Sequence, residues 1–215
     1  MDKYAITLDT YNKSARQYQD KFMNLDLYND GYDGFCFLLE KDNASVLDIA
    51  CGPGNITRYV LSEHPHYHMM GIDLAPCMIE LAAMNNPSAS FAVMDCRNIS
   101  SIDQTFDGIF CGFGMPYLNE EACDRLIGDM YGLLNPRGVI YFSAMEGDPS
   151  RSGYETTSFS EENKVFIHYH RAAFLLESLE KHHFTLIDLH RQQYPEANGS
   201  FSTDMIFLAR KVSLE

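Results

Sequence analysis

The sequence has 215 residues, with 16 Lys and Arg against 30 Asp and Glu, which gives a formal net charge of −14. This length allows one domain, and a hydrophobic content of 46% excludes intrinsic disorder. The six cysteines are dispersed and form no C-x-x-C pair, which excludes a disulfide scaffold or a zinc site. Since the chain is acidic and no hydrophobic run approaches the roughly 20 residues of a membrane span, we expect a soluble, cytoplasmic monomer or homodimer that binds neither nucleic acid nor membranes.

The N-terminal segment has a helical pattern. Tyr11, Ala15, Tyr18 and Phe22 follow one another at helical spacing and therefore share one face of a helix. A second, shorter apolar helix is expected at 35–39, after two glycines. We expect residues 1–43 to form a helical cap.

Strands then alternate with helices. Short apolar runs predict strands at 45–50, 69–73, 90–94, 106–111 and 138–142. Pro76 suits the first position of the helix after the second strand, and Asn119 suits the N-cap of the helix after the fourth. Alternation of this kind is typical of a doubly wound α/β fold with a parallel sheet covered on both faces. Residues 44–145 are therefore expected to form a cofactor-binding core.

The last third of the chain differs in character. Residues 146–170 begin with a long polar stretch, which favours a lid or substrate-binding loop, and a strand is possible at 165–169. Residues 171–215 contain a helix at 171–182 and two strands, at 184–189 and 203–209, with only turn residues between them. We expect a mostly parallel seven-stranded sheet with an antiparallel last strand.

The most informative segment is the glycine-rich turn at 46–54, Val-Leu-Asp-Ile-Ala-Cys-Gly-Pro-Gly. Gly52 and Gly54 between a strand and a helix let the backbone approach a ligand closely. A dinucleotide loop has a third glycine where this chain has Thr57, and Asp48 would repel a pyrophosphate but attract an ammonium group. The pattern favours a ligand with an amino-acid end over NAD, although an NAD-dependent oxidoreductase stays the weaker alternative.

Residues 46–54 resemble the first motif of the class I S-adenosylmethionine-dependent methyltransferases. Similar segments follow in the family's order at 71–78, 92–96, 106–111 and 133–139. The resemblance implies S-adenosylmethionine as cofactor and transfer of its methyl group to an O, N, S or C atom of a small molecule. It also implies cofactor contacts from Asp48, Gly52, Gly54, Asp73, Leu74, Asp95, Cys96, Phe113, Tyr11 and Tyr18.

The resemblance implies that each of three acidic residues contacts a different part of the cofactor. Asp48 and the glycines are expected at the methionine end, Asp73 at the ribose hydroxyls, and Asp95 with the Cys96 amide at the adenine. Asp73 follows Gly52 by the spacing typical of a ribose-binding acid. Tyr11 and Tyr18 would cap the methionine end, or simply face the core. The Asn/Asp-Pro-Pro-Tyr motif of amino-group methylases is absent after the fourth strand.

Candidates for catalysis follow the carboxyl ends of the strands. They are Tyr117, Glu146 and His170, with His170 as the candidate general base because its ordinary pKa lies near neutrality. A structural role for His170, at the entry to a helix or on the surface, is favoured over the catalytic one. His66 with His68, and His168 with His170, form pairs without a third ligand nearby, so no metal site is expected. A protein that binds S-adenosylmethionine without transferring its methyl group stays an open alternative.

Overall fold

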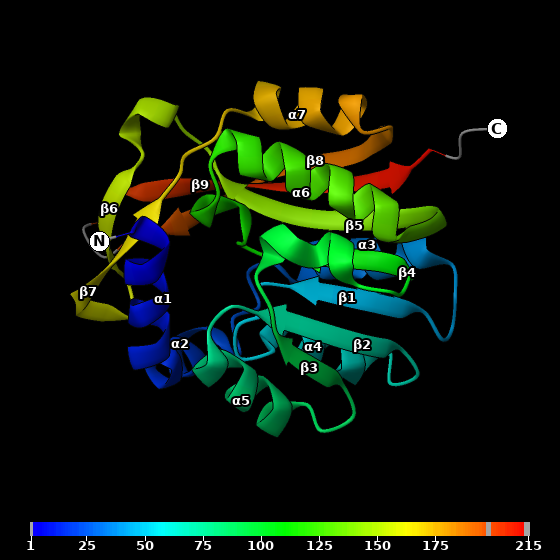
Figure 1. Cartoon of the computed structure of the whole chain (residues 1–215), viewed down its shortest axis with the longest axis horizontal. Coiled ribbons are helices and arrows are strands. Elements are labelled where there is room, and N and C mark those ends of the chain that lie inside the picture. The colour runs from blue at the N-terminus through cyan, green and yellow to red at the C-terminus, as the bar shows by residue number, and fades with distance from the viewer. Residues whose placement is uncertain (1, 197–198, 213–215) are drawn as a thin grey trace.

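A central sheet with helices on both faces forms the body of the molecule (Figure 1), in a computed structural model that describes residues 2–196 and 199–212. The strands are β1 (Ser45–Ile49), β2 (His68–Asp73), β3 (Ser90–Val93), β4 (Phe106–Cys111), β5 (Leu134–Met145), β6 (Gly153–Thr157), β7 (Ser160–Ile167), β8 (Phe184–Pro195) and β9 (Phe201–Lys211). The α-helices are α1 (Lys3–Lys13), α2 (Ala15–Phe22), α3 (Asn29–Leu39), α4 (Asn55–Glu63), α5 (Pro76–Asn85), α6 (Glu120–Leu133) and α7 (Ala172–Lys181). Short 3₁₀ helices are η1 (Cys96–Ser101), η2 (Met115–Tyr117) and η3 (Pro149–Arg151).

The sheet has the order β3-β2-β1-β4-β5-β9-β8 among the described residues. β1 pairs in parallel with β2 and β4, and β4 in parallel with β5. β9 runs antiparallel to both β5 and β8. The predicted fold class, a mostly parallel seven-stranded sheet with an antiparallel last strand, is confirmed.

Alternate residues of the buried strands face two separate hydrophobic layers. In β1, Val46 packs with the α3 and α4 side, whereas Leu47 and Ile49 pack with the α6 and α7 side. All three side chains are fully buried, as expected for a parallel strand covered on both faces. Figure 1 shows α6 and α7 on one side of the sheet and α3 and α4 on the other. This burial fixes the strand ends, and with them the loops that follow β1, β2 and β4.

The N-terminal cap contains two helices, α1 and α2, where the pattern from Tyr11 to Phe22 predicted one face of a single helix. The chain breaks at Ser14, where φ is −111° and ψ is 18°, and the Ser14 hydroxyl accepts a hydrogen bond from Asn163 Nδ2 at 3.1 Å. The aromatic rings of Tyr11 and Tyr18 nevertheless meet, with centroids 5.7 Å apart. The predicted clustering of these side chains therefore holds across the break.

Residues 147–163 differ from the irregular loop that their polarity predicts. β6 and β7 form an antiparallel hairpin that lies along α1 (Figure 1). Thr10 Oγ1 donates to the Lys164 carbonyl oxygen at 2.7 Å, and the Phe166 amide donates to Thr7 Oγ1 at 3.1 Å. These partners are more than 150 positions apart in the chain, so local composition could not reveal the pairing.

Two predicted helix starts are confirmed. The Asn119 side chain accepts from the Ala122 amide at 3.0 Å at the start of α6, and Pro76 opens α5. None of the helices in the described part of the chain is both long and apolar enough to cross a membrane.

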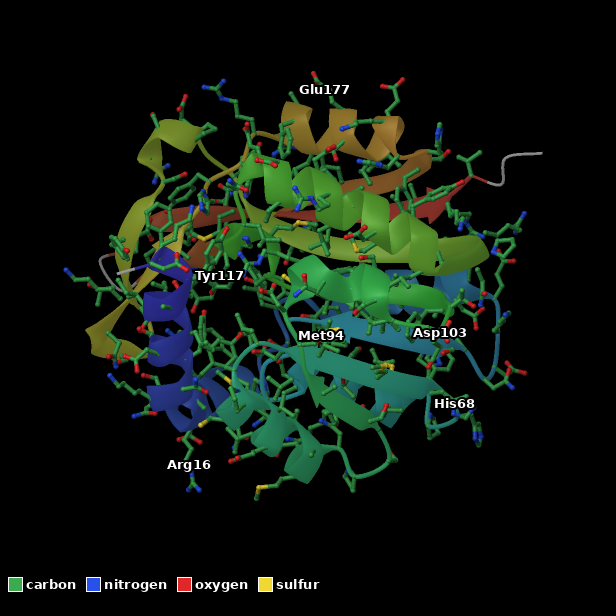
Figure 2. The ribbon with its side chains drawn as sticks, viewed as in Figure 1. Arg16, His68, Met94, Asp103, Tyr117 and Glu177 are labelled. Atoms are coloured by element: carbon green, nitrogen blue, oxygen red, sulfur yellow. The ribbon has the colours of Figure 1, made fainter. Side chains whose placement is uncertain are left out.

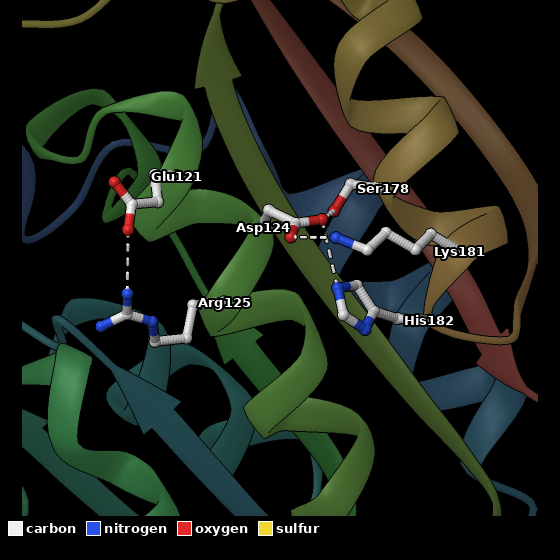
Figure 3. Close-up of polar contacts among 6 residues, drawn as sticks. All are labelled: Glu121, Asp124, Arg125, Ser178, Lys181 and His182. Atoms are coloured by element: carbon white, nitrogen blue, oxygen red, sulfur yellow. Dashed lines mark hydrogen bonds and ion pairs between the residues drawn. The ribbon is translucent and has the colours of Figure 1, made fainter.

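Asp124 on α6 joins that helix to α7 (Figure 3). Its carboxylate accepts hydrogen bonds from the buried Ser178 hydroxyl at 2.8 Å and from Lys181, and His182 Nε2 lies 3.1 Å away. Burial raises the pKa of Asp124, but these hydrogen bonds outweigh burial and hold the pKa below its ordinary value. The ionised carboxylate therefore stabilises the contact between the two helices.

We expect Asp124→Ala to lower the free energy of unfolding by about 1–2 kcal/mol at neutral pH, because the buried Ser178 hydroxyl loses its acceptor. Urea denaturation measures this. Arg125→Ala removes an exposed pair with Glu121 on the same helix (Figure 3) and should cost less than about 0.5 kcal/mol. Since the Asp124 pKa is lowered, the difference between wild type and Asp124→Ala should shrink as the pH falls through that pKa. Equal effects of the two variants would contradict this role for Asp124.

Candidate functional site

The turn between β1 and α4 has an unusual backbone. Ala50, Gly52 and Gly54 have positive φ values of 54°, 53° and 80°, and the Gly54 amide donates to the Cys51 carbonyl at 3.0 Å. A left-handed conformation at a residue with a side chain, as at Ala50, is strained and is found mostly at functional sites. A Cβ added at Gly52 would point into the space in front of Tyr18, 3.6 Å from its ring. The turn therefore opens a cradle beside the sheet.

Asp73 at the end of β2 holds this turn in position. Its Oδ2 accepts from the Gly52 amide at 3.0 Å and its Oδ1 accepts from the Ala75 amide at 2.8 Å. Burial raises the pKa of Asp73, and the hydrogen bonds from the Ala75 and Gly52 amides oppose that rise. One carboxylate thus connects the two loops that follow β1 and β2.

Asp48 in β1 is fully buried behind the turn. Its Oδ2 accepts from the Thr57 hydroxyl at 2.7 Å, and no described residue pairs with its Oδ1. Burial raises the pKa of Asp48 to about 7, with a further rise from Asp73, while the hydrogen bond from Thr57 opposes it. An unpaired buried carboxylate oxygen is costly and is a typical property of a binding site without its ligand.

A cavity lies beside this turn, which we name the glycine-loop cavity. Most of the predicted site residues line it, together with Met94 (Figure 2) and Tyr4. These predicted residues are Tyr11, Tyr18, Gly52, Asp73, Leu74, Asp95, Cys96, Phe113 and Tyr117.

Asp95 lies in the wall of this cavity with a cation as its partner. Arg97 Nε donates to Asp95 Oδ1 at 2.9 Å, and Arg97 Nη2 pairs with Oδ2. The hydrogen bond from Arg97 lowers the pKa of Asp95 despite partial burial. The guanidinium also lies 4.2 Å from the centre of the Tyr4 ring. Arg97 and Tyr4 thus form a flat surface that the sequence did not predict.

A second cavity lies under the β6–β7 hairpin, which we name the hairpin cavity. It shares a wall with the glycine-loop cavity, and the residues that line both are Tyr11, Tyr18, Ala50, Gly112, Phe113 and Tyr117. The Tyr11 and Tyr117 hydroxyls are hydrogen-bonded to each other, and Tyr117 lies beside α1 (Figure 2). Phe113 has a strained φ of 58°, which the hydrogen bond from its amide to Ser143 Oγ at 2.8 Å maintains. Aromatic side chains therefore separate two adjoining cavities.

Much of the rest of the hairpin cavity comes from segments outside the predicted motifs. Its lining includes Tyr28, Tyr32, Phe159, Tyr194, Glu196 and Asp204. The Tyr28 hydroxyl donates to Asp204 Oδ2 at 2.8 Å, and the Tyr28 ring lies edge-on to Phe113 at 5.1 Å.

Four predicted site residues lie outside both cavities. Gly54 packs on α5, where an added Cβ would lie 2.4 Å from Asn86 Nδ2, and Asp48 lies behind the turn. Glu146 is half-buried in an ion pair with Arg191 Nε at 2.7 Å. His170 is treated separately below.

His170 is fully buried, away from the cavity walls. Its Nε2 donates to the Met115 carbonyl at 3.2 Å, and burial lowers its pKa. Its backbone amide donates to the Met145 carbonyl at 3.0 Å. In this position His170 fixes η2, the segment that contains Tyr117. Within the described chain no group of three or more His, Cys, Asp or Glu residues could hold a metal ion.

Several lining residues escaped the sequence-based prediction. Tyr4 and Leu8 precede the predicted Tyr11 at helical spacing, so extending the N-terminal pattern by two turns would have found them. Asp204, an acid that opens a buried apolar strand, was a detectable anomaly. Phe159 at the tip of the hairpin had no such signal, because only tertiary contacts bring it to the cavity.

Comparisons with known proteins agree with this geometry. Residues 46–138 match the family model described as "Methyltransferase domain". The trans-aconitate 2-methyltransferase of Escherichia coli is 35% identical over 95 residues, which are 44% of this chain and 36% of that protein. The demethylmenaquinone methyltransferase of Thermotoga maritima is 34% identical over 103 residues, 48% of this chain and 44% of that protein. The chain therefore spans less than half the length of these curated relatives.

A solved structure extends the similarity over nearly the whole chain. The 1,6-didemethyltoxoflavin-N1-methyltransferase of Burkholderia thailandensis, solved with 1,6-didemethyltoxoflavin and S-adenosylhomocysteine, superimposes with a TM-score of 0.71 at 21% identity. The match covers 98% of this chain and 89% of that one. At this identity the likeness establishes the fold.

Gly54 offers a matched test of the turn. Gly54→Ala would force both a positive φ of 80° and a contact with Asn86, whereas Gly199→Ala meets a similar φ of 81° with no described atom within 4 Å of the new Cβ. We expect Gly199→Ala to lower the free energy of unfolding by about 1 kcal/mol. Gly54→Ala should lower it by a further 1–3 kcal/mol, roughly the penalty of overpacking. Thermal or urea unfolding measures both, and equal losses would contradict the close approach of the turn to α5.

Proposed function

We propose that this chain, a member of the class I (Rossmann-like) S-adenosylmethionine-dependent methyltransferases, transfers the methyl group of S-adenosylmethionine to a small-molecule acceptor. The observation that carries the proposal is the pair of adjoining cavities. One lies at the glycine turn and Asp73, the other under the hairpin, and they share a wall of aromatic side chains. A methyl group has to pass between two ligands in contact, and this arrangement supports such contact.

The residues at the turn fit the amino-acid end of the cofactor. The unpaired, buried Oδ1 of Asp48 supports binding of an ammonium group on the other side of the turn, through the electrostatic attraction of the carboxylate. The cradle that a Cβ at Gly52 would fill leaves room for the ligand against Tyr18. Thr57, which stands where a dinucleotide loop has glycine, donates to Asp48 and so belongs to the same arrangement.

The remaining cofactor contacts follow the walls of the glycine-loop cavity. We assign the ribose hydroxyls to Asp73, since a carboxylate that accepts two amide hydrogen bonds still has free lone pairs. Leu74, Cys96 and Met94 supply the apolar surroundings of the adenine. Asp95 is held by Arg97, so its contact to the adenine amino group uses the lone pairs that Arg97 leaves free.

Bound S-adenosylmethionine supplies an electrophilic methyl group on a sulfonium sulfur. A lone pair of the acceptor forms the new bond to the methyl carbon, the carbon–sulfur bond pair stays on sulfur, and any proton on the acceptor atom goes to solvent. Tyr11, Tyr18 and Tyr117 hold the reacting groups together and exclude water. Burial raises the pKa of the Tyr117 phenol to about 12, so the hydroxyl stays neutral and acts as a hydrogen-bonding group.

The three predicted catalytic residues receive different roles in this proposal. Tyr117 lines both cavities and is the residue that touches the reacting groups. His170 and Glu146 are positioning residues, because His170 holds η2 through Met115 and Glu146 is tied to Arg191. The rate then derives from orientation in a partly dry site, without a general base from this pair.

Asp73→Ala tests the cofactor site. We expect at least about a tenfold loss of affinity for S-adenosylhomocysteine, measured by isothermal titration calorimetry, because the diol loses its acceptor. Asp103→Ala, an exposed site far from Tyr117 (Figure 2), should bind normally. The wild-type protein, incubated with S-adenosylmethionine and a metabolite extract, should release S-adenosylhomocysteine and a methylated product, which mass spectrometry detects. Unchanged affinity of Asp73→Ala contradicts the ribose assignment, and binding without product contradicts methyl transfer.

Affinity should also depend on pH through Asp48. Its pKa in the free protein is raised to about 7, so the carboxyl is protonated below and negative above that pH. Affinity for the ammonium-bearing ligand should therefore rise between pH 6 and pH 8, by at most about tenfold per unit. Titrations at several pH values should give a flat profile for Asp48→Asn.

Because of Asp48, the stability of the ligand-free protein should change with pH in the opposite direction to the affinity. Because the folded pKa is raised, the stability of the ligand-free protein falls as pH increases towards 7, and Asp48→Asn removes that fall. We expect the variant to be as stable as wild type or more stable at pH 8, in thermal unfolding, although it binds worse. A variant that loses stability at pH 8 would assign Asp48 a purely structural role.

A further inference from the structure

The charges in the hairpin cavity all have one sign. Glu155, Glu196 and Asp204 line it, and among the described lining residues there is no Lys, Arg or His. Lys21 lies at the rim, where it donates to the Ser158 carbonyl at 2.9 Å and its Nζ lies 6.0 Å from the centre of the Tyr194 ring, but it is not part of the lining. A ligand inside this cavity therefore meets carboxylates and no cation among the described lining residues.

Asp204 is the buried member of this set. The residue belongs to β9, its exposed fraction is 3%, and its carboxylate accepts a hydrogen bond from the Tyr28 hydroxyl. Burial raises the pKa of Asp204 to about 6, against the hydrogen bond from Tyr28, and the nearby Glu196 raises it further. A carboxylate in this position is destabilised until a positive group or an N–H donor approaches it.

The walls of the cavity are aromatic. Phe159 at the hairpin tip lies 5.2 Å from Tyr18 and 5.6 Å from Tyr11, measured between ring centroids. Tyr28 links Asp204 to the wall shared with the glycine-loop cavity, because its ring lies 5.1 Å from that of Phe113. Aromatic faces attract flat rings and organic cations. Tyr28 therefore lies between Asp204 and the shared wall.

We propose that the methyl acceptor is a flat nitrogen compound with a positive charge or an amino N–H group, which Asp204 and Glu196 bind while its ring lies among the tyrosines. A carboxylic acid is excluded from this role, since its charge would lie against Asp204 with no cation to offset it. The assignment rests on the proposed function, because it takes the hairpin cavity as the acceptor site. It goes beyond that function by naming the chemistry that the acceptor must offer.

The test uses two probes with the same ring and chain, tryptamine and indole-3-propionate, which differ in the sign of their charge. Each is titrated into the full protein saturated with S-adenosylhomocysteine, at neutral pH. We expect tryptamine to bind at least about tenfold more tightly than the acid. Equal binding, tighter binding of the acid, or binding of neither at millimolar concentration would overturn the proposal.

Charge-neutral variants locate the effect. Asp204→Asn and Glu196→Gln should each weaken tryptamine binding and reduce its advantage over the acid. Asp188→Asn makes the same charge change on the exposed face of β8, outside the lining, and should leave the preference intact. Glu196 is half-buried, and its side chain makes no hydrogen bond or ion pair with the described residues, so its variant keeps the test valid if Asp204→Asn fails to fold. An unchanged preference in Glu196→Gln and in folded Asp204→Asn would contradict the assignment.

The proposed function and the acceptor class can be contradicted separately. If S-adenosylhomocysteine does not bind to the wild-type protein, the proposed function is contradicted. The two probes are then compared on the free protein, where the same outcomes support or overturn the acceptor class. Normal binding of S-adenosylhomocysteine with no preference between the probes contradicts the acceptor class alone.

Discussion

The Asp73 carboxylate is the contact on which the site depends. It accepts one amide hydrogen bond from the turn after β1 and one from the residue that precedes α5. Each is a bond between a charged acceptor and a backbone donor, which is stronger than a neutral pair and is made where water is largely excluded. Because the parallel strands end at the same edge of the sheet, this one side chain sets the relative position of two cavity walls. It does so while keeping lone pairs for a ligand.

The elements that complete the cavities are fixed by contacts with one another. α1 and the β6–β7 hairpin are joined through Thr10 and Thr7, and the Tyr11 and Tyr117 hydroxyls join α1 to η2. These covering segments lie mainly outside residues 46–138, the part that matches the methyltransferase family model. A shared cofactor core with independent covering segments explains how one fold accepts different acceptors. The proposed acceptor class is therefore inferred from the hairpin cavity of this chain.

The sequence could predict a structural feature when the residues that determine it lie close together in the chain. The parallel strands and the positions of Asp73 and Asp95 after strand ends follow from short motifs whose partners lie nearby in the chain or at the next strand end. The hairpin at 153–167 could not be predicted, because its polar residues are ordered by α1, more than 140 positions away. His170 was a reasonable candidate base from residue type alone, and only its burial against Met115 indicates a positioning role. Asp204 needed the fold to bring β9 against Tyr28.

Five of the acidic side chains with shifted pKa values form two physical groups. Asp95, Asp124 and Glu146 have cationic partners that lower their pKa values. Asp48 and Asp204 are buried with hydroxyl partners instead, and burial raises their pKa values. A carboxylate without a cation reduces the stability of the free protein, so its presence at a cavity is accounted for when the missing positive group belongs to a ligand. One such acid lies behind the glycine turn and the other lines the hairpin cavity. The same physical argument therefore assigns an ammonium group to the first ligand and a cationic or amino group to the second.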